Sequence, residues 1–77
     1  MEAKDLVGKC IEVDLAAMHI SMSGNATFRV VGYSACTNWA IADAGPWGWK
    51  WMEPDDIVIE KCETYWYILP MAITKVL

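Results

Sequence analysis

Three tryptophans separated by single residues are the feature of this sequence that most suggests binding chemistry. Trp47, Trp49 and Trp51 alternate with Gly48 and Lys50. In an extended chain the three indoles project from one face, because successive side chains of a strand point to opposite sides. An indole face attracts a cation by roughly 0.5–2 kcal/mol. The pattern predicts either an aromatic binding surface or a strand that buries its indoles in a core or an oligomer interface.

Other aromatic and acidic side chains could complete a site around these indoles. Trp47 and Trp51 would lie about 13 Å apart along an extended chain, so they cannot both wall one small cage. A nearby carboxylate adds Coulombic attraction and orientation to a bound cation. The candidate ligand-binding or interface residues are therefore Trp39, Trp47, Trp49, Trp51, Asp43, Glu53, Tyr65, Trp66 and Tyr67, with Asp55 and Asp56 as further carboxylates. A cationic or planar small molecule fits such a surface, as does a partner protein.

Residues for catalysis or metal binding do not form a known arrangement. His19 is the only histidine, so any Ser-His-Asp or Cys-His constellation would have to use it. Cys10, Cys36 and Cys62 are far apart, without the short Cys-x-x-Cys spacing of redox motifs or structural zinc. No phosphate-binding glycine pattern occurs either. We expect no catalytic residue, metal or cofactor, and an enzyme that uses His19 or a cysteine is the least favoured alternative.

Composition indicates which partners the chain can have. Apolar residues make up 56% of the sequence and its mean hydropathy is +0.24. A lone small domain cannot easily hide that much apolar surface, so we expect self-association into a homodimer or higher oligomer. A net charge of −4 with six basic residues argues against nucleic acid as a partner. The longest apolar stretch, residues 65–73, is far shorter than the roughly 20 residues that span a bilayer, so we expect no membrane partner.

Cysteine usage bears on localisation. Three cysteines in a chain that lacks a charged-then-apolar leader predict free thiols in a reducing, cytoplasmic compartment.

Hydrophobic periodicity predicts short β-strands separated by turns. Alternating or β-branched and aromatic runs occur at residues 11–15, 27–33, 39–43, 57–61 and 65–69. The apolar residues 71–77 fit an edge strand or a docking segment. The alternation slips across residues 16–17, which allows either a strand that continues through a β-bulge or a helical turn over 15–19. Residues 53–56 have the chemistry of a turn that Asp55 and Asp56 help to shape, and residues 1–5 could form one helical turn.

The strand spacing predicts the fold class. We expect one all-β domain over residues 1–77, mainly antiparallel, with a small strongly bent sheet or an SH3-like barrel of five to six short strands and room for one short helical turn.

Two functions are compatible with such a domain. The first is a homo-oligomeric binding or interaction module whose Trp-rich, acidic surface takes an organic cation or a partner protein. The alternative is an accessory protein of a mobile element, such as a phage or a gene cassette, that blocks a host factor, since small acidic chains without motifs can serve that role.

Overall fold

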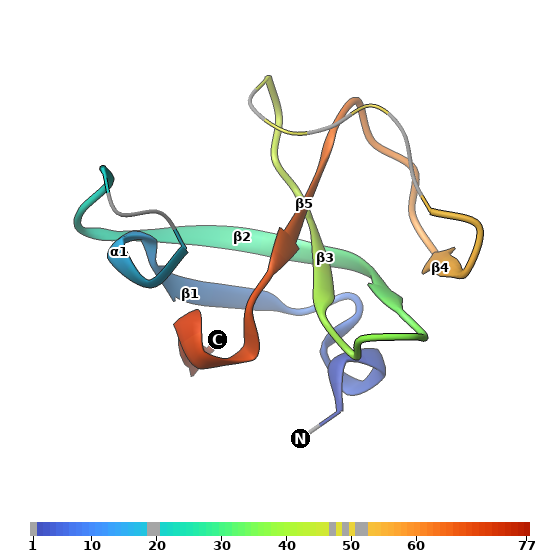
Figure 1. Cartoon of the computed structure of the whole chain (residues 1–77), viewed down its shortest axis with the longest axis horizontal. Coiled ribbons are helices and arrows are strands. Elements are labelled where there is room, and N and C mark those ends of the chain that lie inside the picture. Colours follow the sequence, from blue (N-terminus) through green and yellow to red (C-terminus); the bar gives the residue numbers. More distant parts are fainter. Residues whose placement is uncertain (1, 19–20, 47, 49, 51–52) are drawn as a thin grey trace.

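The fold is a strongly bent antiparallel sheet of six strands (Figure 1). The computed structural model describes residues 2–18, 21–46, 48, 50 and 53–77. Each pairing between strands in this part of the chain is antiparallel. The strands are β1 (Cys10–Asp14), β2 (Asn25–Ser34), β3 (Ala40–Asp43), β4 (Asp56–Val58), β5 (Tyr65–Ile68) and β6 (Ile73–Val76). The prediction of a small all-β fold is confirmed.

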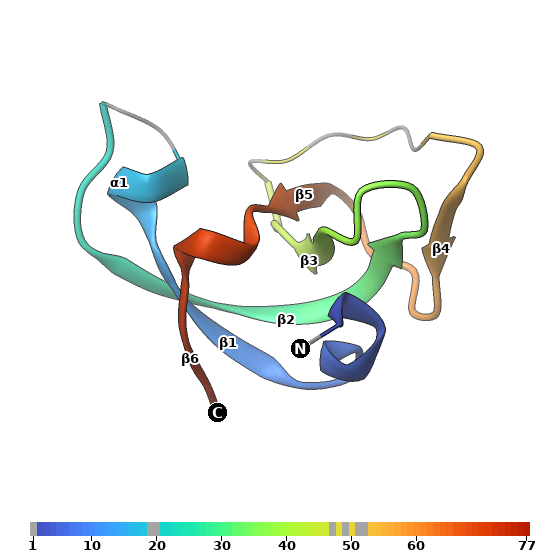
Figure 2. The same ribbon diagram turned by 60° about the horizontal axis from the view of Figure 1, so that its bottom comes forward.

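The long strand β2 organises the sheet. Its first half pairs with β1, and its second half pairs with β3 and with β4. The pairing with β3 shifts between Val30 and Gly32, and a bulge of this kind bends a strand and increases its twist. Figure 2 shows β2 curving along its length. The strand order is β5-β3-β2-β1-β6, with β4 attached to β2 beside this path. The strands β5 and β6 stand at the two ends of this order and do not pair with each other through their described residues, so the sheet is bent and open rather than a closed barrel.

The core consists of two clusters, and β2 contributes a residue to each. Val30 and Val31 are adjacent and fully buried, but they belong to different clusters. Successive side chains of a strand point to opposite sides, so one strand serves both. The larger cluster contains Ile11 and Val13, which lie at the buried positions of an alternating pattern in β1. The smaller one contains Ile41, with Tyr67 packed against it.

The segment after β1 settles the choice between a continuing strand and a helical turn. Residues Leu15–Met18 form the short helix α1, so the continuing strand was the wrong alternative. The leucine, alanine and methionine of this segment have high helix propensity. The polar start of the chain forms the 3-10 turn η1 (Ala3–Leu6), which agrees with the predicted helical turn.

The last elements differ in detail from the expected strands. β4 ends at Val58, earlier than the expected strand, because the amides of Ile59 and Glu60 donate to the carbonyl of Val31 at 2.8 and 3.3 Å. Pro70 opens the 3-10 turn η2 (Pro70–Ala72), and β6 follows at the sheet edge. The edge-strand interpretation of the C-terminal segment is therefore confirmed.

Candidate binding site

The turn between β2 and β3 is closed by backbone hydrogen bonds. The Ser34 amide donates to the Trp39 carbonyl at 2.9 Å, and the Asn38 amide donates to the Ser34 carbonyl at 2.9 Å. Asn38 has a φ of 62°, a left-handed conformation that asparagine tolerates better than most residues. Its Oδ1 accepts a hydrogen bond from the Ala3 amide at 3.0 Å. This turn places Trp39 just before β3 with 36% of its surface exposed.

A second turn lies beside the first. The Asp56 amide donates to the Glu53 carbonyl at 3.0 Å, and the Glu53 amide donates in return to Asp56 Oδ2 at 2.9 Å. The Ala35 amide donates to the Asp55 carbonyl at 3.4 Å. Ser34 is the partner of Asp56 in the pairing of β2 with β4. These contacts confirm the predicted turn and bring its carboxylates next to the β2–β3 turn.

Tyr67 of β5 closes the space between the two turns. Its hydroxyl donates a hydrogen bond to Asp56 Oδ2. Burial, and then this bond to Asp56, raise the pKa of Tyr67 to about 12, so the phenol stays protonated at neutral pH and acts as a donor. Asp56 Oδ1 is buried and has no hydrogen-bond partner among the described residues. The negative charge of Asp56 is therefore only partly compensated.

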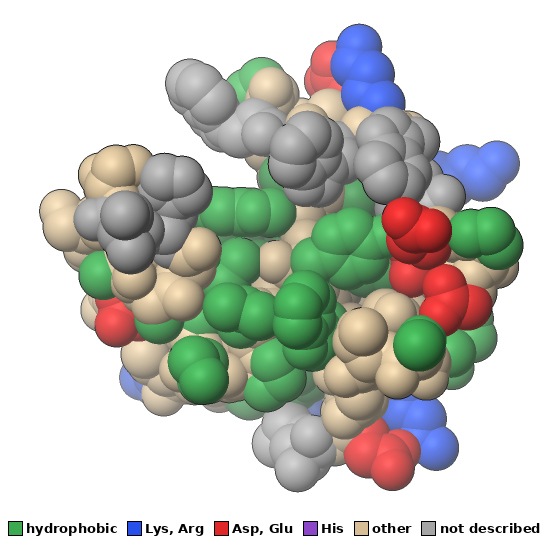
Figure 3. Space-filling view, in the orientation of Figure 1, with side chains coloured by type: hydrophobic (Ala, Val, Ile, Leu, Met, Phe, Trp, Pro, Cys, Tyr) green, Lys and Arg blue, Asp and Glu red, His purple; other side chains and the backbone are tan. Residues whose placement is uncertain are grey.

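Together these elements enclose a cavity of about 360 Å³, which we term the aromatic–acidic pocket. Its lining combines two aromatic rings, three carboxylates, two hydroxyls and one thiol: Trp39, Tyr67, Glu53, Asp55, Asp56, Ser34, Thr37 and Cys36. None of these lining residues is Lys or Arg. Figure 3 shows acidic side chains gathered beside hydrophobic ones on the side of the molecule that carries β4. The pocket can therefore attract a positive charge and place an aromatic face against it.

The structure brings together five of the residues that the sequence proposed for binding, counting the two further carboxylates. Trp39, Glu53, Asp55, Asp56 and Tyr67 line the same pocket although they come from three separate segments of the sequence. Trp47, Trp49 and Trp51, on which the sequence interpretation rested most heavily, lie outside the described residues, and so does His19.

The other proposed residues occupy different places. Tyr65 is 8% exposed, and its hydroxyl accepts a hydrogen bond from the Cys62 amide at 3.3 Å. Trp66 packs edge-to-face on Phe28, with ring centroids 5.4 Å apart and an interplanar angle of 84°. Asp43 accepts a hydrogen bond from the Gly45 amide at 3.0 Å. These contacts stabilise the fold, and none of the three residues lines the aromatic–acidic pocket.

Some lining residues escaped the sequence interpretation. Ser34 and Thr37 were not among the candidates, and Cys36 was predicted only as a free thiol. Asp55 and Asp56 were named as carboxylates near the aromatic residues and as residues that shape a turn, and they do both. The missing signal was the pairing of β2 with β4, because that pairing joins the two turns and is not encoded in local periodicity.

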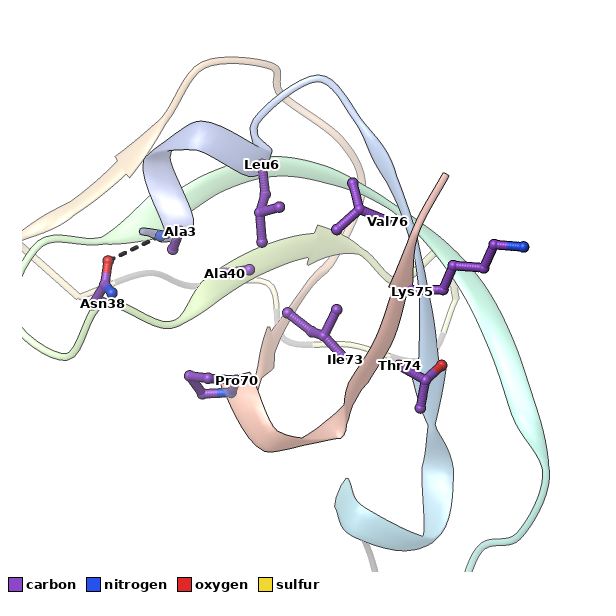
Figure 4. Close-up of a pocket in the computed structure, with 9 residues that line it drawn as sticks. All are labelled: Ala3, Leu6, Asn38, Ala40, Pro70, Ile73, Thr74, Lys75 and Val76. Carbon is purple, nitrogen blue, oxygen red and sulfur yellow. Dashed lines mark hydrogen bonds between the residues drawn. The ribbon is translucent and has the colours of Figure 1, made fainter. Parts of the chain in front are cut away.

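A second cavity, of about 410 Å³, lies between η1 and β6. Figure 4 shows Leu6, Ile73 and Val76 pointing toward one another across it, while Lys75 points away. Leu6 is buried and the other two are partly buried against the larger core cluster. Two polar residues of its lining are engaged within the fold, since Asn38 Oδ1 accepts a hydrogen bond from the Ala3 amide and the Thr74 hydroxyl donates to the Glu12 carbonyl. This cavity therefore lies where the open sheet ends, and these two groups hold the fold together there.

Two negative findings concern the described part of the chain. It holds no group of three or more His, Cys, Asp or Glu side chains placed to bind a metal ion. Its helices are too short to cross a membrane.

Comparison with known proteins finds no relative: no protein-family model, curated protein or solved structure matches the chain. The case for a function therefore depends on the geometry of the pocket.

Proposed function

We propose that this protein is a small binding module that holds an organic cation in its aromatic–acidic pocket. The observation that carries the proposal is the convergence of Trp39, Tyr67 and three carboxylates on one cavity. A cation over an aromatic face gains about 0.5–1 kcal/mol at an exposed site and about 2 kcal/mol or more when desolvated. Carboxylates at the same cavity add attraction and fix where the charge sits.

The three carboxylates have different roles in this proposal. Asp56 is tied to Tyr67 and to the Glu53 amide, so it holds the pocket together. The side chains of Glu53 and Asp55 make no hydrogen bond or ion pair with any described residue. Glu53 and Asp55 are exposed, so both can turn toward a ligand. They are the groups that we expect to pair with the cation.

Protection of a single thiol tests the proposal directly. Cys36 is exposed and lines the pocket, so a Cys10→Ser/Cys62→Ser variant leaves one reporter there. A cationic methanethiosulfonate reagent should modify Cys36 faster than an anionic one, since the carboxylates raise the local concentration of cations. Millimolar n-butylammonium should slow the modification.

A charge-matched control separates the pocket from the overall negative charge. Glu53→Gln/Asp55→Asn removes two carboxylates at the pocket, whereas Asp5→Asn/Glu63→Gln removes two exposed carboxylates that do not line it. The first pair should abolish both the preference for the cationic reagent and the protection, and the second pair should leave both effects. Equal behaviour of the two variants would refute the proposal.

A further inference from the structure

This inference rests on the proposed function: we infer that the aromatic–acidic pocket selects a planar guanidinium group over a quaternary ammonium group. The two kinds of cation differ in what they need from a site. A quaternary ammonium ion has no N–H donor and is held by aromatic rings that surround it. A guanidinium ion has five N–H donors in one plane and can stack on an aromatic face while its edge binds carboxylates.

The described pocket supplies few rings. Trp39 and Tyr67 are the aromatic residues among those that line it. The hydroxyl of Tyr67 is committed to Asp56, and the ring of Tyr67 packs against the smaller core cluster. Trp66 is engaged with Phe28. Among the described residues this leaves Trp39, which is 36% exposed, as the ring with a face to offer, whereas a cage needs several.

The pocket is rich in hydrogen-bond acceptors instead. Glu53 and Asp55 contribute carboxylates that no described residue engages, and their turn lines the same cavity as Trp39. Asp56 lines the cavity as well, and its buried Oδ1 accepts no hydrogen bond from the described chain. Carboxylates that no described residue engages favour a ligand that brings N–H groups, because charge-assisted hydrogen bonds to a carboxylate are about twice as strong as neutral ones.

The arrangement of one free ring beside two free carboxylates matches the shape of guanidinium. A planar cation lying on the Trp39 indole directs its N–H groups outward in its own plane, where side-chain carboxylates can meet them. A primary ammonium ion can use the same carboxylates but lacks the flat face. A trimethylammonium group can use only the indole and the general negative charge.

A matched series of three cations tests this order. The probes are n-butylguanidinium, n-butylammonium and n-butyltrimethylammonium, which share one alkyl chain and one positive charge. Titration of the full chain by calorimetry, with protection of Cys36 as a second readout, should give affinities that decrease in this order. We expect the guanidinium to bind at least about tenfold more tightly than the quaternary ion, the factor that one good charge-assisted hydrogen bond supplies. Equal affinities, or tighter binding of the quaternary ion, would overturn the inference while the proposed function stands.

Failure of the proposed function has a different signature, since none of the three cations would then bind. Two variants locate the preference. In Glu53→Gln/Asp55→Asn the affinity for the guanidinium should fall close to that for the quaternary ion, because the acceptors are weakened. In Trp39→Leu it should fall close to the affinity for the primary ammonium, because the stacking face is lost. Circular dichroism confirms that each variant is folded. A guanidinium preference that survives both substitutions contradicts the assignment to this pocket.

N-acetylarginine N-methylamide distinguishes the two sources of the group. If it binds like n-butylguanidinium, the pocket accepts an arginine side chain of a partner protein. If only the free alkylguanidinium binds, the ligand is a small molecule, and both results support guanidinium recognition.

Discussion

The hydroxyl of Tyr67 on β5 donates a hydrogen bond to Asp56 Oδ2 at the start of β4. These two strands have different partners in the sheet, since β4 pairs with β2 and β5 pairs with β3. The bond therefore joins parts of the fold that the backbone ladder leaves separate. It also fixes the carboxylate that receives the Glu53 amide at 2.9 Å, so the shape of the aromatic–acidic pocket depends on it.

Removal of this hydroxyl should destabilise the protein. Tyr67→Phe keeps the ring but leaves Asp56 Oδ2 with the Glu53 amide as its remaining partner. We expect the free energy of unfolding to fall by about 1.5–3 kcal/mol, which is typical for the loss of a hydrogen bond to a charged group. Urea unfolding of both proteins measures the difference. Tyr33→Phe is the matched control, because the hydroxyl of Tyr33 makes no hydrogen bond within the described chain. It should change stability by less than about 0.5 kcal/mol, and an equal effect of the two substitutions would contradict the role of Asp56.

The Tyr67 phenol also makes the stability of the protein depend on pH in the alkaline range. Burial and the bond to Asp56 raise the pKa of Tyr67 from 10.0 to about 12 in the folded protein. The folded state therefore keeps a proton that the unfolded chain loses first, so this contribution to stability is present below pH 10 and is lost as the pH rises toward 12. The stability difference between wild type and Tyr67→Phe should shrink across that window. Absorbance of phenolate should show a titration step near pH 12, and this step should be absent from Tyr67→Phe.

Two of the three thiols, those of Cys36 and Cys62, should react at different rates. Cys36 is exposed, whereas burial and then the neighbouring Asp43 raise the pKa of Cys62, whose Sγ donates to the Thr64 carbonyl at 3.1 Å. Since the thiolate is the reactive form, a disulfide reagent at pH 8 should modify Cys36 first and Cys62 much later. Mass spectrometry of partially modified, digested protein identifies the order. Faster reaction of Cys62 would show that the loop before β5 opens readily.

Gly32 should tolerate no side chain. A Cβ at this position would overlap the Ile57 carbonyl oxygen and lie 2.9 Å from the Val58 Cα, so β4 could not keep its pairing with β2. Gly32→Ala should lower the free energy of unfolding by about 1–3 kcal/mol, as overpacking of a core does. It should also weaken cation binding, because β4 carries Asp56. Gly8→Ala is the control, since Gly8 has a φ of +87° but open space around its Cβ position. It should lower stability through backbone strain alone and leave the pocket intact.

The sequence predicted the strands well because each is marked locally. β1 is encoded by alternation, and β2 and β5 by β-branched and aromatic runs. The turn at 53–56 was predicted from its own residues. The aromatic–acidic pocket could be predicted only in part, since Trp39, Glu53 and Tyr67 meet through the bend of β2 and the pairing of β4 with β2. Neither feature leaves a periodic signal, so the three tryptophans at 47–51 dominated the interpretation, and those residues lie outside the described chain.

Two exposed apolar side chains lead to the last prediction, that the protein self-associates through its C-terminal segment. Met71 and Leu77, which lie on either side of β6, are 81% and 56% exposed, and burial of such side chains on a second copy would contribute roughly 25 cal/mol per Å² of apolar surface. The strand edge itself is a poor junction, because the β1–β6 register shifts and Lys75 is exposed there. We therefore expect contact through side chains.

Light scattering coupled to size exclusion should show an oligomer that Met71→Ser/Leu77→Ser dissociates. Ile57→Ser/Ile59→Ser, the matched change at β4, should leave the mass unchanged, and a monomeric wild type at high concentration would refute self-association.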